Sequence, residues 1–310
     1  MLKDTNQMTY IVAGVDPSIR PEPADSLVPP DRSLPYWRAV AVMATKHDKA
    51  ALVGPALTEA LGLEVIEAVV DTDVLGTFSG EVERVGSPLD TAVAKARMGM
   101  AEAGVTLGVA SEGTIGPSAA MPFLSAAREL VVLVDDERGI VHAETEVGYD
   151  LVAIGVDVGP DEDMTVHLER AGFPAHALVV RPTGGFAPLF KAVRELDTLH
   201  RAIEACCEVA ASGRARVETD LRAHLCPSRR PIIARAARRL AARVGTACPE
   251  CSSPGFGIVR LETGVPCAWC GRDTEMVRDR VLGCVACKAE LIEPVTVGTA
   301  DPGRCAWCNP

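Results

Sequence analysis

The feature that most constrains this chain is a set of eight cysteines arranged as four Cys-x-x-Cys pairs near its C-terminus. The pairs are Cys248/Cys251, Cys267/Cys270, Cys284/Cys287 and Cys305/Cys308. Each pair presents two thiolates from one tight turn, and two such knuckles complete a tetrahedral four-cysteine zinc site with Zn–S distances of about 2.3 Å. Eight ligands therefore predict two zinc ions with no open coordination position, as in structural sites.

Two other roles for Cys-x-x-Cys pairs fit the sequence less well. A redox pair usually lies in a thioredoxin-like βαβ context, which these cysteines lack. Disulfides need an oxidising compartment, whereas Met1–Val15 has no signal-peptide pattern and predicts a cytoplasmic protein. No stretch approaches 18 consecutive apolar residues, so no membrane-spanning helix is expected.

The spacing does not decide which knuckles share an ion. The gaps between successive knuckles are 15, 13 and 17 residues, so sequential, nested and interleaved pairings all remain open. The segment from Cys267 to Cys287 is most typical of one zinc ribbon, with residues 272–283 as its hairpin. We therefore expect the first and last knuckles to share the other ion.

Composition and charge narrow the class of protein further. Apolar residues make up 48% of the chain, which is enough for a sizeable core and excludes collagen and disulfide-rich secreted scaffolds. The net charge is −11, yet residues 214–310 hold 15 Lys/Arg against 10 Asp/Glu. A basic tail would favour nucleic acid. Each four-cysteine zinc centre carries two negative charges, however, which reduces the surplus of five positive charges to about one.

The remaining basic segment, Arg214–Arg243, predicts an amphipathic helix. Ile233, Ala236, Leu240 and Val244 recur at helical spacing, and the arginines Arg235, Arg238, Arg239 and Arg243 lie mostly off that stripe. The arginine face either packs on the acidic part of the chain or contacts phosphate or RNA.

The pattern before this helix predicts an α/β domain with a mixed sheet. Residues 1–35 are rich in proline and are expected to be a disordered lead-in. Strands and helices alternate over 36–185, with an antiparallel hairpin of 129–135 and 140–145. Residues 186–245 are expected to be a helical segment, and 246–310 the zinc-binding module.

Polar residues follow two of the expected strands, where open α/β sheets bind ligands. Thr45, Lys46 and Lys49 follow the strand 39–44 and open a helix, which makes a candidate phosphate cradle. The strand 107–110 is expected to lead into a loop, 111–117, that carries Glu112. Further candidates are Lys95 on a helix, and Asp71, Asp73, Glu81 and Glu83 in the loop 71–86.

The order of these motifs resembles the Maf/inosine-triphosphatase-like group of nucleotide pyrophosphatases over residues 38–158. The resemblance rests on Ala44-Thr45 followed by Lys49, on Lys95-Ala96, and on Ser111-Glu112-Gly113. It implies that Thr45, Lys46, Lys49 and Lys95 contact the phosphates of a nucleotide. It also implies that Glu112, with Glu81 as a second carboxylate, holds Mg²⁺ or activates the attacking water. His47 stands where that group has Asn.

A second resemblance covers residues 36–310. The segments Leu75–Glu81, Glu218–His224 and Cys248-Pro-Glu-Cys251 are similar to an uncharacterised bacterial family, domain of unknown function 6671. That family implies no activity. If Glu218–His224 is helical, Asp220 and His224 are neighbours, as are Glu218 and Arg222. These residues either form intrahelical pairs or complete an active site.

Two functions are therefore expected of this chain. The first is Mg²⁺-dependent hydrolysis of a nucleotide or related phosphoanhydride, centred on Glu112 and on Lys46 and Lys49. The alternative is a non-enzymatic module that binds nucleic acid or protein through the arginine-rich helix and the zinc knuckles.

Overall fold

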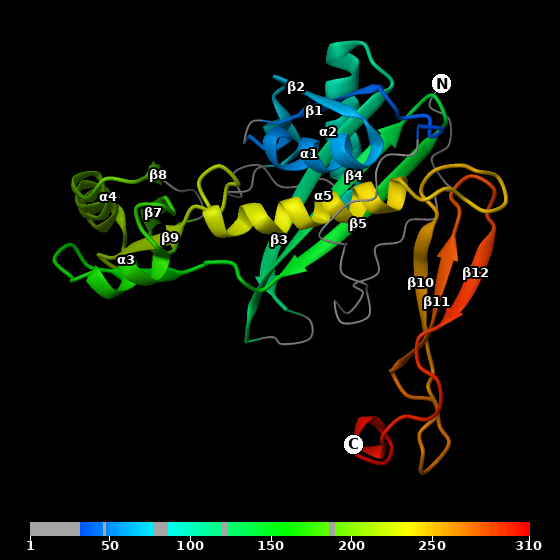
Figure 1. Cartoon of the computed structure of the whole chain (residues 1–310). Helices are drawn as coiled ribbons and strands as arrows, with labels where there is room; N and C mark the ends of the chain where they lie inside the picture. Colours follow the sequence, from blue (N-terminus) through cyan, green and yellow to red (C-terminus); the bar gives the residue numbers. More distant parts are fainter. Residues whose placement is uncertain (1–31, 46–47, 77–85, 119–122, 186–189) are drawn as a thin grey trace. The chain divides into compact units, whose positions relative to one another are not determined.

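The computed structural model describes residues 32–45, 48–76, 86–118, 123–185 and 190–310 (Figure 1). The chain divides into two compact units. The larger unit comprises residues 38–58 and 63–240, and the smaller comprises the described residues up to Trp37 with 59–62 and 241–310. Most of the expected disordered lead-in, residues 1–31, lies outside the described residues. No helix of the described segments is long and apolar enough to cross a membrane.

The larger unit is built on a five-stranded mixed sheet. Its elements are β1 (Val40–Ala44), α1 (Ala50–Leu61), β2 (Glu64–Ala68), α2 (Pro88–Ala103), β3 (Leu107–Pro117), β4 (Ser125–Asp135) and β5 (Ile140–Gly148). The strand order is β2-β1-β3-β4-β5. Strand β1 runs parallel to β2 and β3, whereas β4 runs antiparallel to both β3 and β5. The expected mixed sheet is confirmed.

Helix α2 begins with the sequence signature of a strong helix start. The Ser87 hydroxyl accepts a hydrogen bond from the Asp90 amide, and the Asp90 carboxylate accepts one from the Ser87 amide. This capping box fixes the first turn. The apolar side of α2, including Ala92, Ala96 and Met100, then packs on the sheet in one core cluster.

Strand β3 is longer than the sequence predicts. The expected loop 111–117 is wrong, because β3 continues to Pro117 and pairs with β4 along its whole length, from Leu107↔Asp135 to Pro117↔Ser125. The glycines in this stretch indicate a turn locally, but the long apolar partner strand keeps it extended. Glu112 therefore lies within a strand and not in a loop.

The larger unit also contains a second, four-stranded antiparallel sheet. Its elements are β6 (Gly155–Val158), α3 (Thr165–Ala171), β7 (Leu178–Pro182), β8 (Phe190–Val193), α4 (Leu196–Val209) and β9 (Ala215–Thr219). The strand order is β6-β9-β7-β8, and α4 packs its apolar side against this sheet. The stretch 186–245, expected to be helical, thus includes two strands, which are held in place by pairing with β7.

Helix α5 (Arg230–Val244) is the predicted arginine-rich helix. The stripe of Ile233, Ala236, Leu240 and Val244 is fully buried, as its spacing predicts. Arg235 and Arg239 both donate to the Glu146 carboxylate of β5, at 3.1 and 2.5 Å. Part of the arginine face therefore packs on an acidic residue of the same unit.

The smaller unit contains an antiparallel sheet of three strands, β10 (Gly257–Thr263), β11 (Val277–Gly283) and β12 (Glu290–Pro294). The strand order is β10-β11-β12. The expected hairpin at 272–283 is wrong, because this segment supplies only one strand, β11. That strand pairs with β10 on one side and β12 on the other.

Candidate functional site

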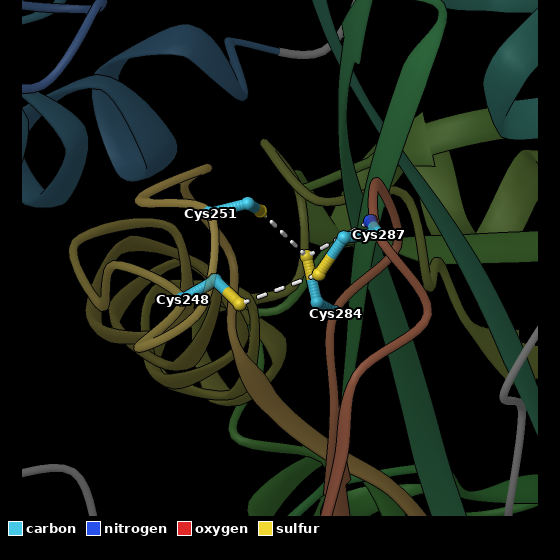
Figure 2. Close-up of side chains that lie close together, drawn as sticks. All are labelled: Cys248, Cys251, Cys284 and Cys287. Carbon is cyan, nitrogen blue, oxygen red and sulfur yellow. Dashed lines mark hydrogen bonds between the residues drawn. The ribbon is translucent and has the colours of Figure 1, made fainter.

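The eight cysteines of the knuckles form two separate groups of four. The first cysteine group consists of Cys248, Cys251, Cys284 and Cys287 (Figure 2). Its Sγ atoms lie 3.7 Å apart for Cys248–Cys287 and also for Cys251–Cys284. Four thiolates about 2.3 Å from a central zinc form a tetrahedron with edges of about 3.8 Å. The donor set and its spacing therefore fit Zn²⁺.

The second cysteine group consists of Cys267, Cys270, Cys305 and Cys308. Its Sγ separations are 3.8 Å for Cys267–Cys308 and 3.7 Å for Cys270–Cys305, so this group fits zinc equally well. The ligand set predicted from sequence thus forms two groups that could hold metal. The pairing that we favoured from the sequence is wrong, because the knuckles interleave, first with third and second with fourth.

The three strands explain this interleaving. Strand β10 runs from the first knuckle to the second, β11 returns to the third, and β12 runs on toward the fourth. Because neighbouring strands are antiparallel, successive knuckles alternate between the two ends of the sheet. One cysteine group therefore forms at each end.

Local hydrogen bonds reach the sulfur atoms of the first cysteine group. In the third knuckle the amides of Ala286 and Cys287 donate to Cys284 Sγ, at 3.4 and 3.5 Å. In the first knuckle, hydrogen bonds from Ser253 lower the pKa of Cys251 to about 6. Four thiolates leave no position for a substrate, so both groups are suited to hold the fold together and not to catalyse.

The other candidate site is a polar pocket beside the end of strand β1. Strand β1 stops at Ala44, whereas its neighbour β3 continues, so Ser111–Gly113 extend past the end of β1. The pocket is lined by Met43, Ala44, Thr45, Lys49, Thr72, Asp73, Gly76, Lys95, Ser111, Glu112, Gly113 and Arg229. Its volume of about 40 Å³ admits about three waters. This space admits a small polar group, such as one end of a larger ligand.

Two of the predicted site residues form an ion pair in this pocket. Lys95 Nζ on α2 lies 2.7 Å from Glu112 Oε2 on β3, and the side chains are only 14% and 9% exposed. The pair neutralises the Glu112 carboxylate in a largely desolvated position. Removing one partner of such a pair leaves an uncompensated charge in a mostly buried position, which lowers the stability of the fold.

Lys49 lies in the same pocket and makes one hydrogen bond within the described part of the chain. Its ammonium donates to the carbonyl oxygen of Ser111 at 3.3 Å. Burial, and then the positive charge of Arg229, lower the pKa of Lys49 to about 8. The buried Ser111 hydroxyl has no hydrogen-bond partner among the described residues. Lys49 is therefore a cation that a bound anion could contact.

The structure places some of the remaining predicted site residues in the pocket and others outside it. Thr45 is buried and lines the pocket, as does Asp73. Lys46 and Glu81, and also Glu83, lie outside the described residues. Asp71 accepts a hydrogen bond from the Asp73 amide at 3.1 Å and so begins the short 3₁₀ helix Thr72–Leu75.

Sequence reasoning missed a buried ion pair in the wall of the pocket. Arg229, which is 1% exposed, binds the fully buried Glu129 of β4 through two hydrogen bonds of 2.5 and 3.0 Å. It also donates to the Leu221 carbonyl at 2.7 Å. The signal that could have revealed this pair is Glu129 itself, an acid directly before the apolar run 130–134 of β4.

Gly113 allows Arg229 to cross the strand at this point. A Cβ atom at position 113 would lie 2.0 Å from Arg229 Nη2 and 2.9 Å from the carboxylate oxygens of Glu129. The glycine of the Ser111-Glu112-Gly113 motif is therefore required by this close approach and not by a turn.

The segment Glu218–His224 is not the helix considered above. Strand β9 ends at Thr219, and a turn follows it. Glu218 binds Arg181 and Arg216, while Asp220 binds Arg222 at 2.6 Å and accepts a hydrogen bond from the Ala192 amide. These carboxylates hold the second sheet and its turn in place, and neither lines the polar pocket.

A comparison with models of protein families gave a match that covers most of the chain. A family model described as "Domain of unknown function (DUF6671)" matches residues 95–310. The chain belongs to this family. The DUF6671 match includes Lys95, Glu112, Glu129, Arg229 and all eight knuckle cysteines, whereas Thr45 and Lys49 precede it. Comparisons with curated proteins and with solved structures gave no match. The resemblance to Maf/inosine-triphosphatase-like enzymes is not confirmed.

Proposed function

We propose that this DUF6671 protein is a zinc-stabilised hydrolase that cleaves the phosphoanhydride bond of a nucleotide or a related small molecule. The observation that carries the proposal is the meeting of Lys49, Ser111 and the Lys95–Glu112 pair in one pocket beside the end of β1. Ammonium groups suit phosphate oxygens, and a carboxylate suits a metal or an attacking water.

The residues of the pocket divide into two chemical roles. Lys49, whose one hydrogen bond within the described residues is 3.3 Å long, can turn its remaining donors toward a phosphate. Lys95 holds Glu112 in place until the substrate draws the ammonium toward its own negative charge. The Glu112 carboxylate then accepts a proton from the attacking water.

The pocket also fits Mg²⁺ chemically. Glu112 and Asp73 both line it, and Mg²⁺ prefers oxygen ligands and usually binds through one or two carboxylates together with substrate phosphates. When bound, Mg²⁺ neutralises the charge that builds up on phosphate oxygens during cleavage.

The alternative function, nucleic-acid binding through the arginine-rich helix, has less support. Arg235 and Arg239 are engaged by Glu146 within the same unit, so a nucleic acid would have to compete for them. Neutralising both arginines removes salt-sensitive RNA binding if that alternative holds.

The test is the release of phosphate and pyrophosphate from a panel of standard and modified nucleoside triphosphates with Mg²⁺. The wild type is compared with Glu112→Gln and with the matched control Glu102→Gln, which changes an exposed residue of α2. We expect Glu112→Gln to lose turnover by about 100-fold or more while Glu102→Gln retains it. Equal turnover in Glu112→Gln, or none in the wild type on any substrate, contradicts the proposal.

A further inference from the structure

The second cysteine group carries a repeated motif whose large side chains face solvent. Both of its knuckles read Cys-Ala-Trp-Cys, at 267–270 and 305–308. Trp269 is 80% exposed and Trp307 is 66% exposed. Two of the three tryptophans of the chain are therefore displayed on one four-cysteine group. Tryptophan is on average highly buried, so two exposed indoles in one cysteine group are unusual.

One of the two indoles already has a cation on its face. The guanidinium of Arg272 lies 3.6 Å from the centroid of the Trp307 ring, which is close cation–π contact. Arg272 lies two residues after Cys270, the last cysteine of the second knuckle. The residue two beyond Cys308, at the equivalent place of the repeat, is Pro310. Within the part of the chain that the structure describes, no cation lies over Trp269.

The charge around the two knuckles favours a positively charged partner. The segments that flank them carry the exposed acids Asp273, Glu275 and Asp301 and the exposed arginines Arg272 and Arg304. A four-cysteine zinc centre adds two negative charges. The patch is therefore net negative, which attracts a guanidinium and opposes the phosphates of a nucleic acid.

The backbone that presents Trp269 is held in place on both sides. The Ala268 amide donates to the Ala300 carbonyl at 3.0 Å, and Ala300 in turn donates to the Pro266 carbonyl at 2.8 Å. Cys267 and Cys270 anchor the knuckle to the metal group. Little ordering is needed when a partner binds, which lowers the free-energy cost of association.

We propose that Trp269 is a docking site for an arginine side chain of a partner protein, presented on an extended basic segment. The segment's guanidinium stacks on Trp269 as Arg272 stacks on Trp307, and its neighbouring positive charges face the acidic rim. This site belongs to the zinc-bearing unit and does not depend on the hydrolase proposal.

The test is isothermal titration calorimetry of the full-length, zinc-loaded protein with an arginine-glycine peptide. Lysine-glycine and glutamate-glycine peptides of equal length serve as controls. We expect the arginine peptide to bind most tightly, and Trp269→Ala to weaken its binding by about fivefold, the loss of one cation–π contact. Trp307→Ala, which removes the indole that Arg272 already covers, is expected to weaken binding less.

Zinc content of each variant is measured alongside, so that a collapsed knuckle is not read as a lost contact. Equal affinity in Trp269→Ala with zinc retained overturns the proposal. Salt-dependent binding of a single-stranded RNA oligonucleotide that exceeds binding of the arginine peptide also overturns it. If Trp269→Ala loses zinc, Trp269→Leu is measured in its place, because leucine keeps an apolar side chain without the aromatic face.

Discussion

Lys95 donates a hydrogen bond of 2.7 Å to Glu112, and this pair joins helix α2 to strand β3 inside the polar pocket. Both side chains are mostly buried, at 14% and 9% exposed, so each stabilises the charge of the other. The pair holds the carboxylate in a fixed position.

This ion pair predicts that substitutions at the two positions have non-additive effects on the free energy of unfolding. Lys95→Met leaves Glu112 without the ammonium in a largely buried site, and we expect a loss of about 3 kcal/mol in the free energy of unfolding. The double variant Lys95→Met/Glu112→Gln removes both charges and is expected to recover most of that loss. Urea denaturation followed by circular dichroism measures both. A double variant whose loss equals the sum of the two single losses contradicts the coupling.

Gly113 is predicted to tolerate no side chain. Gly113→Ala places a methyl group 2.0 Å from Arg229 Nη2, so the buried Arg229–Glu129 pair must shift. We expect a loss of about 3 kcal/mol in the free energy of unfolding. The matched control is Gly116→Ala in the same strand, where a Cβ meets nothing within 4 Å. Similar stability in the two variants argues against the tight packing at Gly113.

The lowered pKa of Lys49 predicts how stability changes with pH. The pKa is about 8 in the folded protein against 10.5 ordinarily, so between these values the unfolded chain binds more protons than the folded one. This group therefore increases stability as pH rises from about 8 to 10.5, and the gain is lost again as pH falls back to 8. Lys49→Met removes that contribution. Free energies of unfolding measured from pH 7 to 10.5 test this, and parallel curves for the two proteins refute it.

The pairing of the knuckles predicts the zinc content of double variants. Cys251→Ser/Cys287→Ser alters two ligands of the first cysteine group, so one zinc per chain remains. Cys251→Ser/Cys305→Ser alters one ligand of each group and is expected to lose both. Elemental analysis of the purified proteins gives the numbers. In the nested pairing suggested by the sequence the two results are exchanged, so this measurement separates the two arrangements.

The cysteines of the two groups could be identified from sequence, whereas their pairing could not. A Cys-x-x-Cys knuckle is a local feature, so its spacing is sufficient to identify it. Which knuckles share an ion depends on the strands between them. Each gap, of 15, 13 or 17 residues, is long enough for either a strand or a loop, so its length does not distinguish the two. The antiparallel order of β10, β11 and β12 decided the pairing.

The polar pocket was predictable only in part, for a similar reason. Thr45, Lys49, Lys95 and Glu112 were identified from local sequence, and the structure brings them to one pocket. Arg229 and Glu129 are 100 residues apart, and no local pattern connects them. The extension of β3 past Ser111 was also missed, because two glycines indicated a turn while the pairing with β4 depends on residues farther along the chain.

The central claim, that this pocket binds a phosphoanhydride, is tested most directly by calorimetric titration with methylenediphosphonate, a non-hydrolysable analogue, in the presence of Mg²⁺. The wild type is compared with Lys49→Met and with Lys288→Met, which changes an exposed lysine outside the pocket. We predict that the wild type and Lys288→Met bind the analogue alike and that Lys49→Met binds it about tenfold more weakly, through loss of a charge-assisted hydrogen bond. Equal binding by all three proteins, or no binding by the wild type, would contradict the claim.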